Sequence, residues 1–102
     1  MAAGIIGGMS TEITHNADQK RYEIRLDGEL AGFAAYEPAG SGSIALTHTE
    51  IDPAFEGKGL GGALARGLLD DLRVEGRTVI PVCPFIKGWI GRHPDYRDVV
   101  AA

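Results

Sequence analysis

The fold is decided by one glycine-rich stretch of the sequence, Glu56-Gly57-Lys58-Gly59-Leu60-Gly61-Gly62. Glycine has no Cβ, so successive backbone N–H groups can converge on one point, and the start of the following helix adds partial positive charge. These features predict a loop that holds a phosphate or pyrophosphate group. The alternative is that the glycines serve only close packing of a helix against a sheet.

Two familiar nucleotide-binding patterns do not fit this stretch. A Walker A loop places Ser or Thr after its Gly-Lys pair to bind magnesium, whereas Lys58 is followed by Gly59. Gly57, Gly59 and Gly62 formally match the G-x-G-x-x-G pattern, but too little chain follows to build a dinucleotide-binding fold. We therefore interpret that match as accidental.

The residues after the stretch predict a helix, a strand and a second helix. Leucines recur at every fourth position, which is typical of an amphipathic helix, and Gly76 is a good terminator. The apolar run 79–82 predicts a buried strand, parallel to the strand before the glycines because a right-handed crossover joins them. A last short helix is predicted from 84 to about 92, since His93 precedes a proline. The leucines of the first helix are Leu60, Leu64, Leu68 and Leu72.

Four strands are predicted before the stretch, at 11–15, 22–26, 30–36 and 44–51. The second alternates apolar and charged residues, the period of a half-buried strand, and Asp27-Gly28 is a strong hairpin signal. Short connections make these four strands antiparallel. The predicted fold class is therefore α+β, with a mixed, mainly antiparallel five-stranded sheet and two helices.

Composition limits the classes of function. The 102 residues are 44% hydrophobic and carry a net charge of -4. This composition predicts one globular domain and argues against a dedicated nucleic-acid binder. We place the domain at 9–102, after a flexible leader at 1–8, because Met9 is a second plausible start. A single cysteine, Cys83, excludes an internal disulfide and a cysteine-ligated zinc cluster, so no metal is expected. With no apolar run near the roughly 20 residues of a membrane span, we expect a cytoplasmic protein without a membrane partner.

The glycine stretch and its surroundings resemble the GNAT superfamily of acetyl-CoA-dependent N-acyltransferases. The family pattern is Arg or Gln, two residues, Gly, one residue, then Gly or Ala. Gly59 and Gly61 fill the glycine positions, whereas Glu56 fills the first position and carries the wrong charge beside a pyrophosphate. The run from Glu50 to Gly61 also resembles the family's strand, proline-containing turn, loop and helix, and the resemblance extends from Thr11 to Pro94.

The resemblance implies a cosubstrate, a chemistry and a class of acceptor. The loop Gly57, Lys58, Gly59, Leu60, Gly61 and Gly62 would hold the pyrophosphate of acetyl-CoA. The backbone at Ile51 would pair with the pantetheine arm, and an N–H near it would polarise the thioester. Ordinary members insert two helices between their first two strands, where this chain has only 16–19. It therefore resembles a minimal single-domain branch, with an open site for an amine on a protein or other large acceptor.

Cys83 is the first candidate catalytic residue. It lies between a strand and Pro84, so it is predicted to be the N-cap of the last helix, where the dipole would activate its thiol. It could then take the acetyl group from coenzyme A. Alternatively it is a small buried apolar residue, as most lone cysteines are, and the amine attacks the thioester directly.

Glu50 and His48 are the other catalytic candidates. Strict alternation would place both on the same strand face as Ile44 and Leu46, at the mouth of a cleft. Glu50 could deprotonate an ammonium acceptor through water. Each residue has a plain structural alternative, an exposed carboxylate for Glu50 and a hydrogen-bonded core residue for His48.

Two further expectations follow from the sequence. Phe85 and Trp89 lie four positions apart on the last helix, which favours two core anchors over a wall for an acyl-CoA. The off-pattern Glu56 and the missing helices leave open a second function, a non-catalytic acyl-CoA or coenzyme A binding module.

Overall fold

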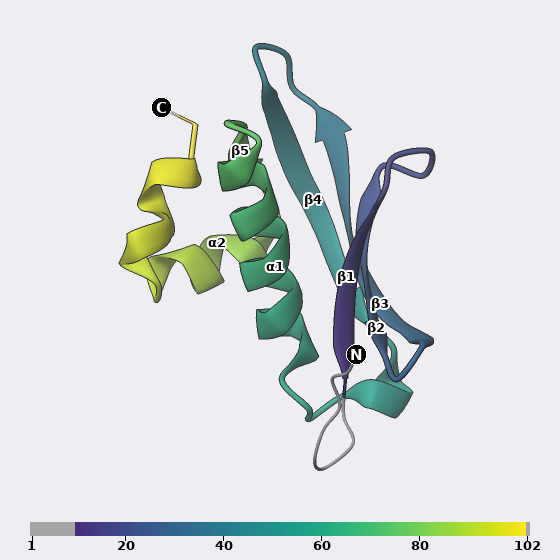
Figure 1. The fold of residues 1–102 in the computed structure, drawn as a ribbon. Helices are drawn as coiled ribbons and strands as arrows, with labels where there is room; N and C mark the ends of the chain where they lie inside the picture. Colours follow the sequence, from purple (N-terminus) through teal and green to yellow (C-terminus); the bar gives the residue numbers. More distant parts are fainter. Residues whose placement is uncertain (1–9, 102) are drawn as a thin grey trace.

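The computed structural model describes residues 10–101, so the predicted leader at 1–8 lies outside the described residues. Five strands form one sheet in the order β1-β2-β3-β4-β5, with β5 parallel to β4 and all other neighbours antiparallel. The elements in chain order are β1 (Thr11–Asn16), β2 (Arg21–Leu26), β3 (Glu29–Pro38), β4 (Ser43–Ile51), η1 (Pro53–Phe55), α1 (Leu60–Val74), β5 (Thr78–Pro81), α2 (Pro84–Gly91) and η2 (Pro94–Val99), shown in Figure 1.

The predicted fold class is confirmed, and the predicted strand limits agree to within two residues. The two short 3₁₀ helices η1 and η2 are additions. Pro94 does end α2, as expected, but it also begins η2, since proline is well suited to the first helical position.

Helix α1 lies across one face of the sheet and builds the core with it (Figure 1). Its four periodic leucines are all buried, and each contributes roughly 1.5–3 kcal/mol when fully removed from water. Gly67 lets α1 approach β1 closely, because a Cβ there would collide with the Ile13 side chain. The fourfold leucine repeat therefore fixes the helix above the strands that lead to the glycine loop.

A β-bulge in β4 reverses the direction of its last side chains. Tyr36 pairs with Leu46, but the next residue of β3, Ala35, pairs with His48, so Thr47 is the extra residue. A bulge shifts the alternation by one position. The prediction that His48 and Glu50 share a face with Ile44 and Leu46 is therefore wrong: the latter are buried, whereas the side chains of His48 and Glu50 are 59% and 62% exposed.

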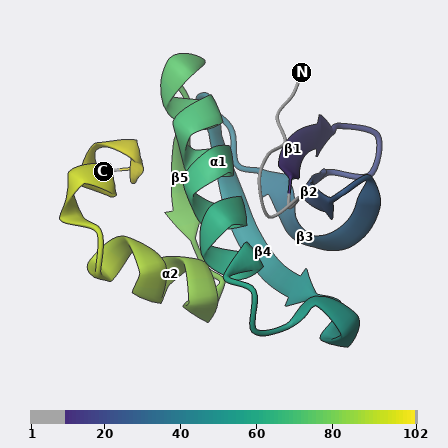
Figure 2. The same cartoon turned by 60° about the horizontal axis from the view of Figure 1, so that its bottom comes forward.

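The bulge also marks the point where β4 and β5 separate. Their parallel pairing runs from Ser43 with Thr78 to Leu46 with Pro81. One further backbone bond, from the Cys83 N–H to the Leu46 carbonyl at 2.8 Å, closes the pairing. Figure 2 shows the two strands diverging beyond this point, with the start of α1 and α2 at the open end.

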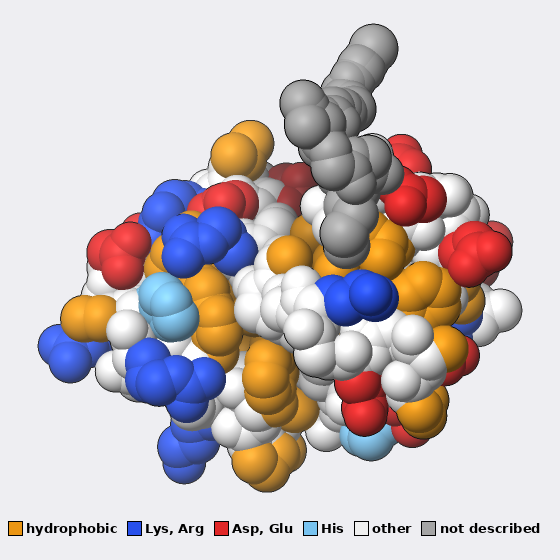
Figure 3. Space-filling view, turned by 90° about the horizontal axis from the view of Figure 1, so that it is seen from below, with side chains coloured by type: hydrophobic (Ala, Val, Ile, Leu, Met, Phe, Trp, Pro, Cys, Tyr) orange, Lys and Arg blue, Asp and Glu red, His pale blue; other side chains and the backbone are white. Residues whose placement is uncertain are grey.

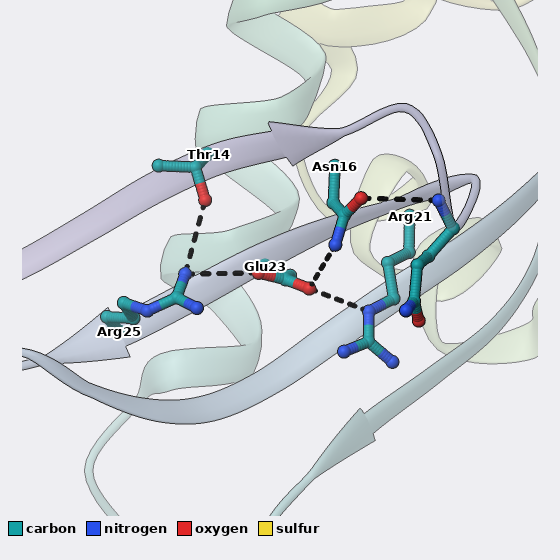
Figure 4. A network of polar contacts seen from close by, with 6 residues as sticks. Thr14, Asn16, Arg21, Glu23 and Arg25 are labelled. Atoms are coloured by element: carbon teal, nitrogen blue, oxygen red, sulfur yellow. Dashed lines mark hydrogen bonds and ion pairs between the residues drawn. The ribbon is translucent and has the colours of Figure 1, made fainter.

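A polar network covers part of the sheet face opposite α1. Glu23 is only 5% exposed and accepts hydrogen bonds from Asn16 at 3.0 Å, Arg21 at 2.8 Å and Arg25 at 3.1 Å (Figure 4). The hydrogen bonds from Asn16 and then Arg21 lower the pKa of Glu23 to about 2. The Arg21 guanidinium lies 4.6 Å from the centre of the Phe33 ring, so the network extends to β3.

Among residues 10–101, no helix has both the length and the apolar character needed to cross a membrane.

Candidate functional site

The glycine loop adopts the conformation that a phosphate cradle needs. Gly57 and Gly59 have φ values of +83° and +73°, in the left-handed region that favours glycine. Gly59 is the N-cap of α1, and the first helical hydrogen bond runs from the Ala63 N–H to the Gly59 carbonyl. The preceding amides of Leu60, Gly61 and Gly62 therefore belong to the unpaired first turn of the helix.

A cavity of about 350 Å³ opens over these amides. It is lined by most of the predicted loop residues and also by Ile51, the predicted backbone contact. Lys58 is exposed beside this cavity and does not line it. We call this cavity the cradle; it is lined by Gly57, Gly59, Leu60, Gly61 and Gly62, with Ile51, Glu56 and the phenylalanines Phe55 and Phe85 around them.

Phe85 is a wall of the cradle rather than a core anchor, and the expectation for it is wrong. Its side chain is 40% exposed, and its Cζ lies 2.9 Å from the position that a Cβ on Gly61 would take. Trp89, in contrast, is buried as expected. The two residues share a helix face, but Trp89 packs against Tyr96 and His93 while Phe85 projects at the start of the helix toward the glycines.

Beside the cradle, one backbone edge of β4 has no pairing partner beyond Leu46 among residues 10–101, and we call it the free edge. The Asp52 N–H donates to the Ala31 carbonyl of β3 at 2.8 Å. Because backbone groups alternate between the two edges of an antiparallel strand, Ile51 and Thr49 direct theirs toward the other edge. That is the side from which β5 diverges after Leu46. The edge can therefore pair with an extended ligand that enters between the strands.

Cys83 lies at the point of divergence. It is the N-cap of α2, as predicted, but its side chain makes no capping hydrogen bond and the residue is only 4% exposed. Its Sγ lies 3.4 Å from Oγ1 of Thr49. Thr49 was not anticipated, because only the bulge turns this side chain of β4 toward the start of α2.

Glu50 and His48 lie together on the opposite face of β4. The His48 Nε2 is 3.6 Å from Glu50 Oε2, and the His48 ring is 6.1 Å from the Phe33 ring. Glu50 lines a second cavity, whereas His48 lines neither of the two. The structure thus brings Glu50, but not His48, to a cavity next to the cradle.

This second cavity is an open groove of about 540 Å³. Its lining includes the apolar residues Leu30, Phe33 and Pro53 and the acidic residues Glu50, Asp52 and Glu56. It shares Ile51 and Glu56 with the cradle. We call it the acidic groove. The two cavities therefore meet at the end of β4.

Basic side chains lie on the other side of the cradle. Figure 3 shows the end of the molecule where α1 begins, with most Lys and Arg side chains of this view gathered over α2 and η2. Lys87 of α2, Arg92 at the C-cap of α2 and Arg66 of α1 are exposed, and within residues 10–101 none forms an ion pair. These cations can attract an anionic ligand locally although the whole chain is acidic.

Comparisons with known proteins agree with this geometry. Residues 21–99 match the family described as GCN5-related N-acetyl-transferase. Protein NATD1 of Xenopus tropicalis is 26% identical over 99 residues, covering 92% of this chain and 91% of its own. The human Protein NATD1 is 26% identical over 88 residues, covering 85% and 78%.

Two solved structures are also similar. A GCN5-like protein from Staphylococcus aureus has the same fold, with a TM-score of 0.67, 21% identity and coverage of 89% of this chain and 88% of its own. The ribosomal-protein-S18-alanine N-acetyltransferase of Escherichia coli matches with a TM-score of 0.52 and 27% identity, over 58% of this chain and 38% of its own. The glycine cradle, the diverging strands and the family match over residues 21–99 together assign the chain to the GCN5-related N-acetyltransferase family.

Proposed function

We propose that this chain transfers the acetyl group of acetyl-CoA to a primary amine on a protein or another large acceptor, in the cytoplasm and without a metal. The observation that carries the proposal is the position of the cradle directly beside the free edge of β4. Acetyl-CoA needs a site for its pyrophosphate, which the cradle would supply. Next to it, the extended pantetheine arm needs a strand edge to pair with, which Ile51 and Thr49 would supply.

The residues fit the anionic part of acetyl-CoA. The unpaired amides of the first turn of α1 and the positive end of its dipole favour a pyrophosphate. Phe85 adds an apolar wall. Lys58, Lys87 and Arg92 are exposed and would supply cations to the outer phosphates. Glu56 opposes binding, because its carboxylate lines the same cavity.

The reaction needs a free amine, an electrophilic carbonyl and a leaving thiol. Glu50 would take a proton from the ammonium group of the acceptor through water. The amine nitrogen then forms a bond to the thioester carbon, and an N–H near Ile51 stabilises the charge on the carbonyl oxygen. The carbon–sulfur bond breaks, the attacking nitrogen gives up its second proton, and the thiolate takes that proton up, so the products are an amide and coenzyme A.

Two routes remain for the attack. In the direct route the amine attacks acetyl-CoA. In the two-step route Cys83 first takes the acetyl group, releasing coenzyme A, and the amine then releases the cysteine thiol. The burial of Cys83 and its contact with a threonine hydroxyl, rather than with a base, favour the direct route.

A protein acceptor is supported by two observations. The connection between β1 and β2 is a four-residue turn at the opposite end of the sheet from the cradle (Figure 1), so it does not enclose the acceptor side. The similar Escherichia coli enzyme is named for an alanine of a ribosomal protein.

The test is the intact mass of protein and of lysine peptides after incubation with acetyl-CoA. We expect acetylated peptide, formed only with the protein present. The second candidate function, a coenzyme A binding module without turnover, is favoured by Glu56. It would be supported if acetyl-CoA raises the melting temperature of the protein while no peptide gains an acetyl group.

A further inference from the structure

The family assignment does not specify the acceptor, but the residues that line the acidic groove indicate its chemical class. The groove is the larger of the two cavities and meets the cradle at Ile51 and Glu56. An acceptor bound there would therefore lie next to the free edge of β4. This inference rests on the proposed function, because it concerns the acceptor of that same reaction.

The groove is lined by both apolar and acidic residues. Leu30 is 41% exposed, so an apolar stem can lie against it, whereas the half-buried Phe33 ring already has the Arg21 guanidinium 4.6 Å from its centre. Asp52 and Glu56 are exposed, and within residues 10–101 neither forms an ion pair. No Lys or Arg of that described range lines the groove. The side chains of Lys and Arg match this arrangement, since each combines an apolar stem with a cationic head.

The negative charge of Glu56 does not suit a pyrophosphate in the cradle. This residue departs from the Arg or Gln of the family pattern, and its charge weakens the attraction of the cradle for a pyrophosphate. Because Glu56 also lines the acidic groove, its carboxylate can instead attract a cation on the acceptor side. The same residue would then weaken cosubstrate binding and strengthen acceptor binding.

We propose that the acidic groove binds a basic peptide segment, in which Lys or Arg residues flank the amine that is acetylated. Charge complementarity and continuity with the cradle select this occupant. The open shape of the groove suits an extended segment of a larger chain rather than an enclosed small molecule.

The test uses the full chain saturated with coenzyme A and two labelled peptides, read by fluorescence anisotropy. One peptide has an acceptor lysine flanked by arginines, and the other has glutamines in their place. We expect the arginine peptide to bind about tenfold more tightly at low salt, with an advantage that falls as salt screens the charges. Equal affinity for the two peptides would overturn the inference.

The matched variants are Asp52→Asn with Glu56→Gln, and Glu12→Gln as a control on β1 with the same type of charge change. Asn is as good as Asp at an N-cap, so the first change keeps the cap that Asp52 forms on η1. We expect the double variant to retain its fold, bind coenzyme A more tightly, and lower the arginine advantage to about twofold. An advantage that survives in the double variant, or is lost equally in Glu12→Gln, would contradict the inference.

Two further outcomes separate this inference from the proposed function. If the arginine peptide binds as expected but is never acetylated, the groove assignment stands and the enzymatic proposal fails. If peptides are acetylated without any preference for flanking arginines, the enzymatic proposal stands and the groove inference is wrong. If a linear polyamine displaces the arginine peptide at a concentration below that of the peptide, the occupant of the groove is a small polycation and the peptide assignment is wrong.

Discussion

At the scale of single residues, the central question is what Cys83 does. Its thiol is buried beside Thr49, at the point where β4 and β5 part. This position is close to where a thioester would lie along the β4 edge. Position alone does not make a nucleophile, because the two-step route also needs a group that accepts the thiol proton.

We expect Cys83→Ala to retain acetyl transfer within about tenfold, an effect of roughly 1.4 kcal/mol or less on the barrier. The change removes a small side chain that direct attack does not use. Steady-state rates on a lysine peptide test this, and Thr49→Val provides a matched change in the same contact. A loss of several orders of magnitude in Cys83→Ala, with an acetyl group found on the native cysteine, would establish the two-step route instead.

At the scale of elements, the loop and the first turn of α1 make the cradle. Gly59 is needed there for its positive φ, and Gly61 for the close approach of Phe85. The bulge in β4 supplies the second half of the site, since it ends the pairing with β5 near the cradle. The proposed binding of acetyl-CoA therefore depends on two backbone irregularities.

We expect Gly59→Ala to weaken acetyl-CoA binding at least about tenfold, because strain at a positive φ will shift the amides that follow it. Gly40→Ala is the matched control. Gly40 has the same φ of +73° and open space around it, but it lies in the hairpin between β3 and β4. Calorimetric titration measures both, and equal binding by the two variants would argue against a cradle at Gly59.

How far the sequence predicts these elements depends on how local each signal is. The leucine repeat and the alternation of 22–26 depend on neighbouring residues alone, and both elements were predicted correctly. Thr47 has no local feature that marks it as a bulge, so the directions of His48, Thr49 and Glu50 required the pairing register. Spacing places Phe85 and Trp89 on one face, but only the packing of α2 shows that Phe85 meets the cradle.

At the scale of the whole molecule, the small fold relies on polar cover for its second sheet face. The buried Glu23 joins β1 and β2 through Asn16, Arg21 and Arg25. A domain of this size is stable by about 5–15 kcal/mol, so a network of this kind is a significant part of the total.

We expect Glu23→Gln to lower the free energy of unfolding by about 2–3 kcal/mol at neutral pH, because three donors lose a charged acceptor. The pKa of Glu23 is lowered from 4.5 to about 2 in the folded state. Its contribution is therefore present above about pH 4.5 and is lost as the pH falls toward 2. Urea unfolding across this range should show the native and variant proteins converging in acid, whereas a constant difference would exclude this role.

Acetyl-CoA binding at the cradle and along the free edge of β4 is tested most directly by an NMR titration of backbone amides. We predict that the largest chemical-shift changes fall on residues 57–62 and on Thr49 and Ile51, with the β3–β4 hairpin around Gly40 unchanged. If saturating acetyl-CoA leaves the chemical shifts of the amides of 57–62 unchanged, or changes only those of residues far from them, acetyl-CoA does not bind at the cradle.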